Sequence, residues 1–258
     1  MTRKTIIAIV SAVAVAAGAT AVGAGYALQS KDPVEPVLAQ EQHVGMDRTV
    51  EVEPVDITGK NVTEIGSIAC FATIYNNPTE QLVDSDAVVY AQVEAVEYFT
   101  LEGVPWNKMD VLVLDAYKGD VQAGDRISIT QFGGYLPLAE QIRVFNDGDK
   151  FSDMTQEEID NTIFKKTMEG APLPEAGERD VYFVVKAVTE GLPEGVYEVN
   201  CSFQSQYILN DEGTLERYAP MEGYYRIGEP ESRAGDTDRI WNGERAYTVE
   251  EMAALLKS

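Results

Sequence analysis

The sequence has few of the side chains on which most catalytic and metal sites depend. Its 258 residues include one histidine, His43, two cysteines and two tryptophans. A histidine needs a positioned partner to act as a general base, and zinc usually takes several His or Cys ligands. The sequence also lacks Gly-x-Ser-x-Gly, a phosphate-cradling glycine loop and Cys-x-x-Cys. These absences argue against common catalytic classes and predict a protein that is not an enzyme and has no cofactor or metal.

Basic residues are also scarce. Lys and Arg number 20 against 43 Asp and Glu, which gives a formal net charge of −23. Such a surface repels nucleic acid and anionic lipid headgroups, so no nucleic-acid partner is expected. The charge keeps an exported protein soluble or attracts cations and basic partners.

The N-terminal 30 residues predict export. Arg3 and Lys4 precede an uncharged run from Thr5 to Ser30 that is rich in Ala, Val, Ile and Gly. This pattern is typical of a signal peptide, and the run is also long enough for a retained membrane anchor. The positive-inside rule places the bulk of the chain outside the cytoplasm in either case. We therefore expect an extracytoplasmic protein that is either secreted or, if the segment is uncleaved, held at the membrane by it.

Residues 31–66 read as a disordered acidic linker. They contain Pro33, Pro36 and Pro54, many acids and mostly isolated valines, a composition that cannot form a core. His43 lies in this linker, where a solvated surface position is expected. The folded part is predicted at residues 67–228, and residues 229–258 are predicted as a loop and a C-terminal helix.

Alternating apolar and polar residues, closed by turn signals, predict a mainly β fold. The five expected strands are Val88–Phe99, Trp106–Tyr117, Arg126–Phe132, Asp180–Val188 and Gly195–Leu209, the last in two pieces around Ser202.

Two capping boxes predict helices. Thr155 with Glu158 opens an inserted helix, and Thr248 with Glu251 opens the C-terminal helix. The expected apolar stripe of the inserted helix is Ile159, Ile163, Phe164 and Met168.

Cys70 and Cys201 both lie in apolar, strand-like runs of an exported chain. This context favours one disulfide between them, although two buried free thiols are the alternative. The bond would close a loop of about 130 residues, which the chain-entropy model values at roughly 4–5 kcal/mol.

A series of short motifs covers residues from about 80 to 190. The motifs are Ser85-Asp86, Lys118-Gly119-Asp120, Gly124-Asp125-Arg126-Ile127-Ser128-Ile129, Gly133-Gly134 and Gly177-Glu178-Arg179-Asp180-Val181-Tyr182-Phe183-Val184. This succession resembles a family of exported bacterial proteins, although the last motif has one extra residue before its aromatic residue. The resemblance implies a five-stranded OB-like barrel, as in netrin-like and metalloproteinase-inhibitor domains, and an exported location. It implies no settled activity and no catalytic residues. The inhibitors act through a free N-terminal cysteine, and Cys70 lies far inside this chain.

OB-like barrels bind ligands through a sheet face and its flanking loops. Tyr98, Phe99, Trp106 and Tyr135 lie near expected strand ends and are candidate binding residues if exposed, or core residues if buried. The sequence thus predicts an envelope-associated, non-catalytic binding or interaction module for a surface protein or a small ligand. The alternatives are an inhibitor of an exported protease, by fold analogy, and an acid-dependent hydrolase, which would need two carboxylates facing a cleft.

Overall fold

The computed structural model describes residues 45–67, 73, 75, 77–168, 170–218 and 246–258. The described residues belong to one compact unit. The expected signal or anchor segment, the linker as far as residue 44, His43 and Cys70 lie outside the described residues. Within the described part, no helix has the length and apolar character needed to cross a membrane.

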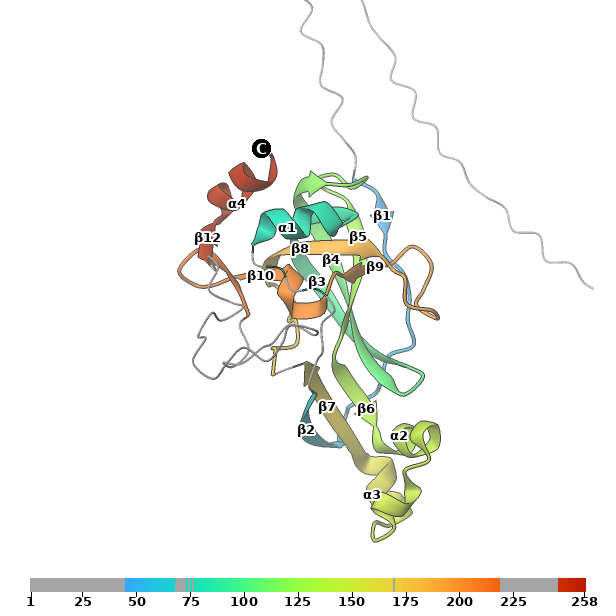
Figure 1. Cartoon of the computed structure of the whole chain (residues 1–258). Helices are drawn as coiled ribbons and strands as arrows, with labels where there is room; N and C mark the ends of the chain where they lie inside the picture. The colour runs from blue at the N-terminus through green and yellow to red at the C-terminus, as the bar shows by residue number, and fades with distance from the viewer. Residues whose placement is uncertain (1–44, 68–72, 74, 76, 169, 219–245) are drawn as a thin grey trace, which may run out of the picture. The chain divides into compact units, whose positions relative to one another are not determined.

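Five strands pair side by side in a closed circuit, so the sheet is ring-like (Figure 1). The strands are β3 (Ala87–Leu101), β4 (Val104–Lys118), β5 (Arg126–Phe132), β8 (Arg179–Lys186) and β9 (Tyr197–Val199). The circuit runs β3, β4, β5, β9, β8 and back to β3; the β5–β9 pair is parallel and the other four are antiparallel. The prediction of a mainly β fold is confirmed.

The tight β3–β4 hairpin follows from its two turn residues. Leu101 pairs with Val104, and Glu102 and Gly103 between them have φ of 51° and 77°. Positive φ at both central residues is the geometry of the turn that matches the twist of a two-residue hairpin.

The interior of the ring is filled by alternate residues of its strands. The buried side chains include Val89, Ala91, Val93, Met109, Val111, Val113, Ile127, Ile129, Tyr182 and Val184. The residues between them along β4 and β5 therefore point to the outer face of the ring, because successive side chains of a strand alternate.

The sheet continues beyond β8 through β10 (Gln206–Leu209), β11 (Thr214–Arg217) and β12 (Ala246–Thr248). The predicted fifth strand is divided, as expected, because η2 (Ser202–Ser205) separates β9 from β10. The C-terminal helix α4 (Val249–Leu256) begins at the Thr248 capping box, and its Met252 and Leu256 pack in a second buried cluster. A short helix, α1 (Pro78–Asp84), precedes β3.

A separate three-stranded sheet has two of its strands between β5 and β8 in the chain and one strand before β3. It consists of β2 (Asn61–Ser67), β7 (Thr162–Met168) and β6 (Gly134–Pro137), with α2 (Leu138–Phe145), η1 (Gly148–Phe151) and α3 (Gln156–Asn161) between β6 and β7. Helix α3 begins at the Thr155 capping box but ends at Asn161, so the predicted stripe is wrong beyond Ile159. Ile163, Phe164 and Met168 belong to β7, because β2 and β6 pair with both edges of this segment.

The structure differs from the linker prediction in residues 45–66. β1 (Asp47–Arg48) pairs with the start of β5, and β2 pairs with β7 along seven residues. None of residues 45–66 is buried. What orders them is hydrogen bonding to strands that are distant in the sequence.

Candidate binding site

The four predicted aromatic residues divide into two groups. Phe99 and Trp106 are 6% and 7% exposed and belong to the core. Tyr98 and Tyr135 are half-buried and pack edge to face, with ring centroids 4.7 Å apart. Burial raises the pKa of Tyr98 to about 12. The structure therefore brings the two tyrosines together, but their contact is with each other across β3 and β6.

A cavity of about 470 Å³ lies elsewhere on the ring, between three separate parts of the chain. Its walls are the segment Arg48–Val50, which begins at the last residue of β1, Asp120 after β4, and residues from the end of β8 to the start of β9. The last group comprises Lys186, Ala187, Leu192, Pro193, Glu194, Gly195, Val196 and Tyr197.

The polar side of the cavity is fixed by Asp120. The Tyr197 hydroxyl donates to Asp120 Oδ1 at 2.8 Å, and Arg48 Nη2 donates to the Asp120 carbonyl oxygen at 3.2 Å. The hydrogen bond from Tyr197, with the positive charges of Lys186 and Arg48, lowers the pKa of Asp120. Burial and the Asp120 carboxylate raise the pKa of Tyr197 to about 12. Asp120 is thus a carboxylate and Tyr197 a neutral phenol at physiological pH, and the cavity presents both charge signs beside apolar Leu192, Pro193 and Val196.

The connection from β8 to β9 folds back on the β3–β4 hairpin. Gly191 has φ of 90°, and a Cβ atom there would lie 2.8 Å from Leu101 Cδ1. The Thr189 hydroxyl lies 3.1 Å from each carboxylate oxygen of Glu198, across the same connection. The connection therefore lies close against Leu101 of the hairpin and is linked to β9 through Thr189 and Glu198.

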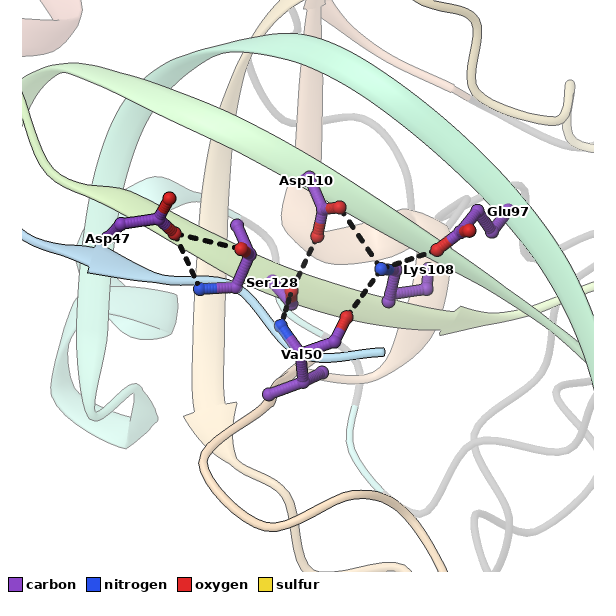
Figure 2. Close-up of polar contacts among 7 residues, drawn as sticks. Asp47, Val50, Glu97, Lys108, Asp110 and Ser128 are labelled. Atoms are coloured by element: carbon purple, nitrogen blue, oxygen red, sulfur yellow. Dashed lines mark hydrogen bonds and ion pairs between the residues drawn. The ribbon is translucent and has the colours of Figure 1, made fainter. Parts of the chain in front are cut away.

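A second polar group lies on the outer face of β4 and β5 (Figure 2). The Lys108 side chain is 2% exposed, and its Nζ lies 2.5 Å from Glu97, 3.0 Å from Asp110 and 2.6 Å from the Val50 carbonyl oxygen. Ser128 Oγ donates to Asp110 at 2.5 Å and accepts from the Val50 N–H at 2.9 Å. Ser128 and Lys108 therefore hydrogen-bond both the N–H and the carbonyl oxygen of Val50.

Lys108 is a charged anchor in this network. Burial lowers the pKa of Lys108, but its hydrogen bonds to Glu97 and Asp110 outweigh that cost, and the net direction is upward. A protonated ammonium has no lone pair, so Lys108 cannot act as a nucleophile or base.

Asp180 carries the strongest electrostatic signature of a catalytic acid, yet it has no access to solvent. Burial raises its pKa to about 6, against hydrogen bonds from Tyr182 and Gln206 that lower it. Both bonds are 2.7 Å long, and the side chain is fully buried. Perturbed carboxylates mark active sites only when they face a cleft, and this one is enclosed by the core.

Within the described ranges, no group of three or more His, Cys, Asp or Glu side chains is placed to hold a metal ion. Cys201 is half-buried, and none of the other described residues is a cysteine with which it could pair. Because Cys70 lies outside the described residues, the disulfide stays a prediction.

Comparisons with known proteins found no matching family model, no matching curated protein and no matching solved structure. The resemblance to an exported OB-like family therefore stays a prediction. The sequence analysis missed both the cavity and the Lys108 network. A lysine next to the core residue Met109 in a predicted strand was the one local signal for the network, whereas the cavity has no local signal at all.

Proposed function

We propose that this protein is an exported, envelope-associated, non-catalytic binding module built on a five-stranded OB-like barrel, with its ligand site in the Asp120 cavity. Barrels of this kind bind through the face of their second and third strands and through the loops joining strands one to two and four to five. With β3, β4, β5, β8 and β9 counted in chain order as strands one to five, these are the β4–β5 face, the β3–β4 hairpin and the β8–β9 connection.

The observation that carries the proposal is the cavity under the β8–β9 connection. Its volume of about 470 Å³ lies within the usual range for small-ligand sites. Apolar residues from one connection meet the paired charges of Arg48 and Asp120, a lining suited to a small ligand, or a short part of a surface protein, with both polar and apolar groups.

The proposed location rests on the first 30 residues, where two positive charges precede a long uncharged run. Fractionation of the native cells tests it. We expect the protein in the membrane fraction if the segment is retained, or outside the cell if it is cleaved; a cytoplasmic protein with an intact N-terminus would contradict export.

The binding site can be tested by screening a fragment mixture against the ¹⁵N-labelled chain. We expect fragments to shift amide signals of Arg48, Asp120 and the non-proline residues of 187–196, and Tyr197→Phe to weaken their binding, because it releases the Asp120 carboxylate. Lys60→Gln is the matched control, since Lys60 contacts the Asp160 carbonyl oxygen and does not line the cavity. Fragments that cluster elsewhere, or a screen without binders at this cavity, would refute the site.

A further inference from the structure

Residues 45–55, here called the strap, run from the edge of β5, where β1 pairs with it, past outer-face side chains of β4 and β5 to β3. The strap begins where the Met46 N–H donates to Asp125 Oδ1 at 2.7 Å and the Met46 carbonyl accepts from the Arg126 N–H at 2.7 Å. It ends where the Val55 N–H donates to the Tyr98 carbonyl at 2.7 Å. Val50, in the middle, is held by Ser128 and Lys108 (Figure 2).

These five contacts all use main-chain atoms of the strap. At Val50, Asp110 orients both partners. Asp110 Oδ1 accepts the hydroxyl hydrogen of Ser128, so the Ser128 oxygen is available to accept from the Val50 N–H, and Asp110 Oδ2 binds the Lys108 ammonium. The face therefore offers an acceptor and a charged donor at the spacing of the N–H and C=O of one extended residue. Recognition through main-chain hydrogen bonds is how strand-addition sites take up peptides of varied sequence.

The strap is held less firmly than the strands beneath it. None of residues 45–55 is buried, and only two of them pair as a strand. The exposed acids Glu51 and Glu53 belong to a chain with a net charge of −23, whose self-repulsion opposes compaction. Segments with few buried contacts open locally at a fraction of the free energy of global unfolding.

We infer that the outer face of β4 and β5 is a binding face for an extended polypeptide segment, and that the strap occupies it as a displaceable internal ligand. The partner supplies a free main-chain N–H and C=O at the position of Val50 and needs no particular side chain there. The inference does not depend on the ligand of the Asp120 cavity.

A matched pair of glycine variants adjusts the strap without touching the face. A Cβ atom on Gly45 would lie 1.8 Å from the Gly124 carbonyl oxygen, whereas one on Gly66 would meet nothing within 4 Å. Gly45→Ala must therefore lift the start of the strap, and Gly66→Ala must not. In the full-length chain we expect amide exchange at Val50 and Val55 to quicken at least about tenfold in Gly45→Ala, the equivalent of about 1.4 kcal/mol, with exchange at Val111 unchanged.

The binding face is then titrated with a synthetic peptide of residues 44–56. A tethered strap competes at an effective concentration in the millimolar range, so the ¹⁵N-labelled Gly45→Ala chain is the receptor of choice. We expect saturable displacement, seen as strap amides moving to the positions of a flexible chain while amides of β3 and β8 stay. A peptide N-methylated at Val50 lacks the donor to Ser128 and should bind about tenfold more weakly.

Three results would each overturn the inference. The first is exchange of the Val50 amide at the rate of the Val111 amide in both variants, which would mean that the strap opens only when the whole domain unfolds. The second is no displacement of the Gly45→Ala strap at millimolar peptide. The third is equal binding of the N-methylated peptide.

Discussion

At the residue scale, two buried charged groups have opposite surroundings. Lys108 is enclosed by two carboxylates and a carbonyl oxygen, and its positive charge is compensated. Asp180 accepts hydrogen bonds from neutral donors of Tyr182, Gln206 and the Leu209 main chain, and burial, with the nearby Glu178 carboxylate, raises its pKa to about 6. The first charge stabilises the fold as an ion, and the second destabilises it as an ion.

We expect Lys108→Met to lower the free energy of unfolding. Removing one partner of a fully buried ion pair costs about 3–5 kcal/mol, and because water reaches Glu97 and Asp110 in part, we expect about 2 kcal/mol here. Urea unfolding measures the change. Lys165→Met is the control, since Lys165 lies 3.9 Å from Glu64 in an exposed pair and should lose little. Equal stability of the two variants would show that the Lys108 network contributes nothing.

Asp180 predicts a specific dependence of stability on pH. Its folded-state pKa of about 6 lies above the ordinary 3.8, so the folded state holds the proton more tightly. Its contribution is therefore fully present below about pH 4 and is lost as the pH rises through about 6, by at most about 3 kcal/mol. Carboxylates with lowered pKa, such as Asp120, act in the opposite direction and at lower pH.

The measurement is urea unfolding from about pH 4 to pH 7.5, with Asp180→Asn and the exposed Asp211→Asn compared with the unchanged chain. Between about pH 4 and 6 we expect the free energy of unfolding to decline in the unchanged chain and in Asp211→Asn, and we expect this decline to be absent in Asp180→Asn. General charge repulsion also grows with pH, but the variants share it, so it cancels in the comparison. The same slope in all three proteins would show that Asp180 does not titrate in this range.

At the element scale, the strands that the sequence predicts well are those whose pattern and turns agree. β5 has its predicted bounds, and β3, β4 and β8 differ by one or two residues at most ends, because alternating apolar residues fill the ring and glycine turns close each strand. The helix prediction after Thr155 went wrong for a physical reason. The capping box fixes where α3 starts, but Ile163 and Phe164 fit a strand equally well, and pairing with β2 and β6 decides the outcome.

The C-terminal helix is an integral part of the fold, and Met252 provides a test. Met252 is fully buried against a cluster that includes Val88, Phe183 and Tyr207. We expect Met252→Ala to cost about 2–4 kcal/mol through lost burial and a new cavity. Met46, which is 47% exposed, is the matched methionine and should cost far less on substitution by Ala. A loss of similar size at both positions, measured by thermal or urea unfolding, would argue against docking of α4 on the sheet.

At the scale of the whole molecule, the candidate site was beyond sequence reasoning because closure of the ring creates it. Arg48, Asp120 and Tyr197 are far apart in the sequence and meet only when β1, β4 and β9 are in place. The predicted aromatic site depended on exposure, which a pattern of residues cannot give: Phe99 and Trp106 are in the core. Local patterns report on strands and caps, whereas cavities depend on long-range pairing.

A disulfide between the two cysteines would be a long-range feature of the whole chain, because it would link the residues before α1 to the β9–β10 junction. The Tyr75 N–H donates to Gln204 Oε1 and Asn200 Nδ2 donates to the Tyr75 hydroxyl, so Tyr75 lies beside the Cys201 region, and Cys70 precedes Tyr75 by five residues, a span of at most about 18 Å. A Cys70–Cys201 bond is therefore within reach of the chain. We expect intact-mass analysis with thiol labelling to show no label before reduction and two labels after it. Reduction should lower the free energy of unfolding by roughly 4–5 kcal/mol in the chain-entropy model.

Single and double serine variants separate the bond from the side chains. If the cysteines are bonded, Cys70→Ser and Cys201→Ser each remove the same cross-link, so the double variant should be little less stable than either single one. If both are free thiols, the two losses should be small and should add. Two labelled thiols in protein taken from the native cells without reductant would contradict the disulfide, and the closed ring and the α4 cluster would then stabilise the domain without a covalent link.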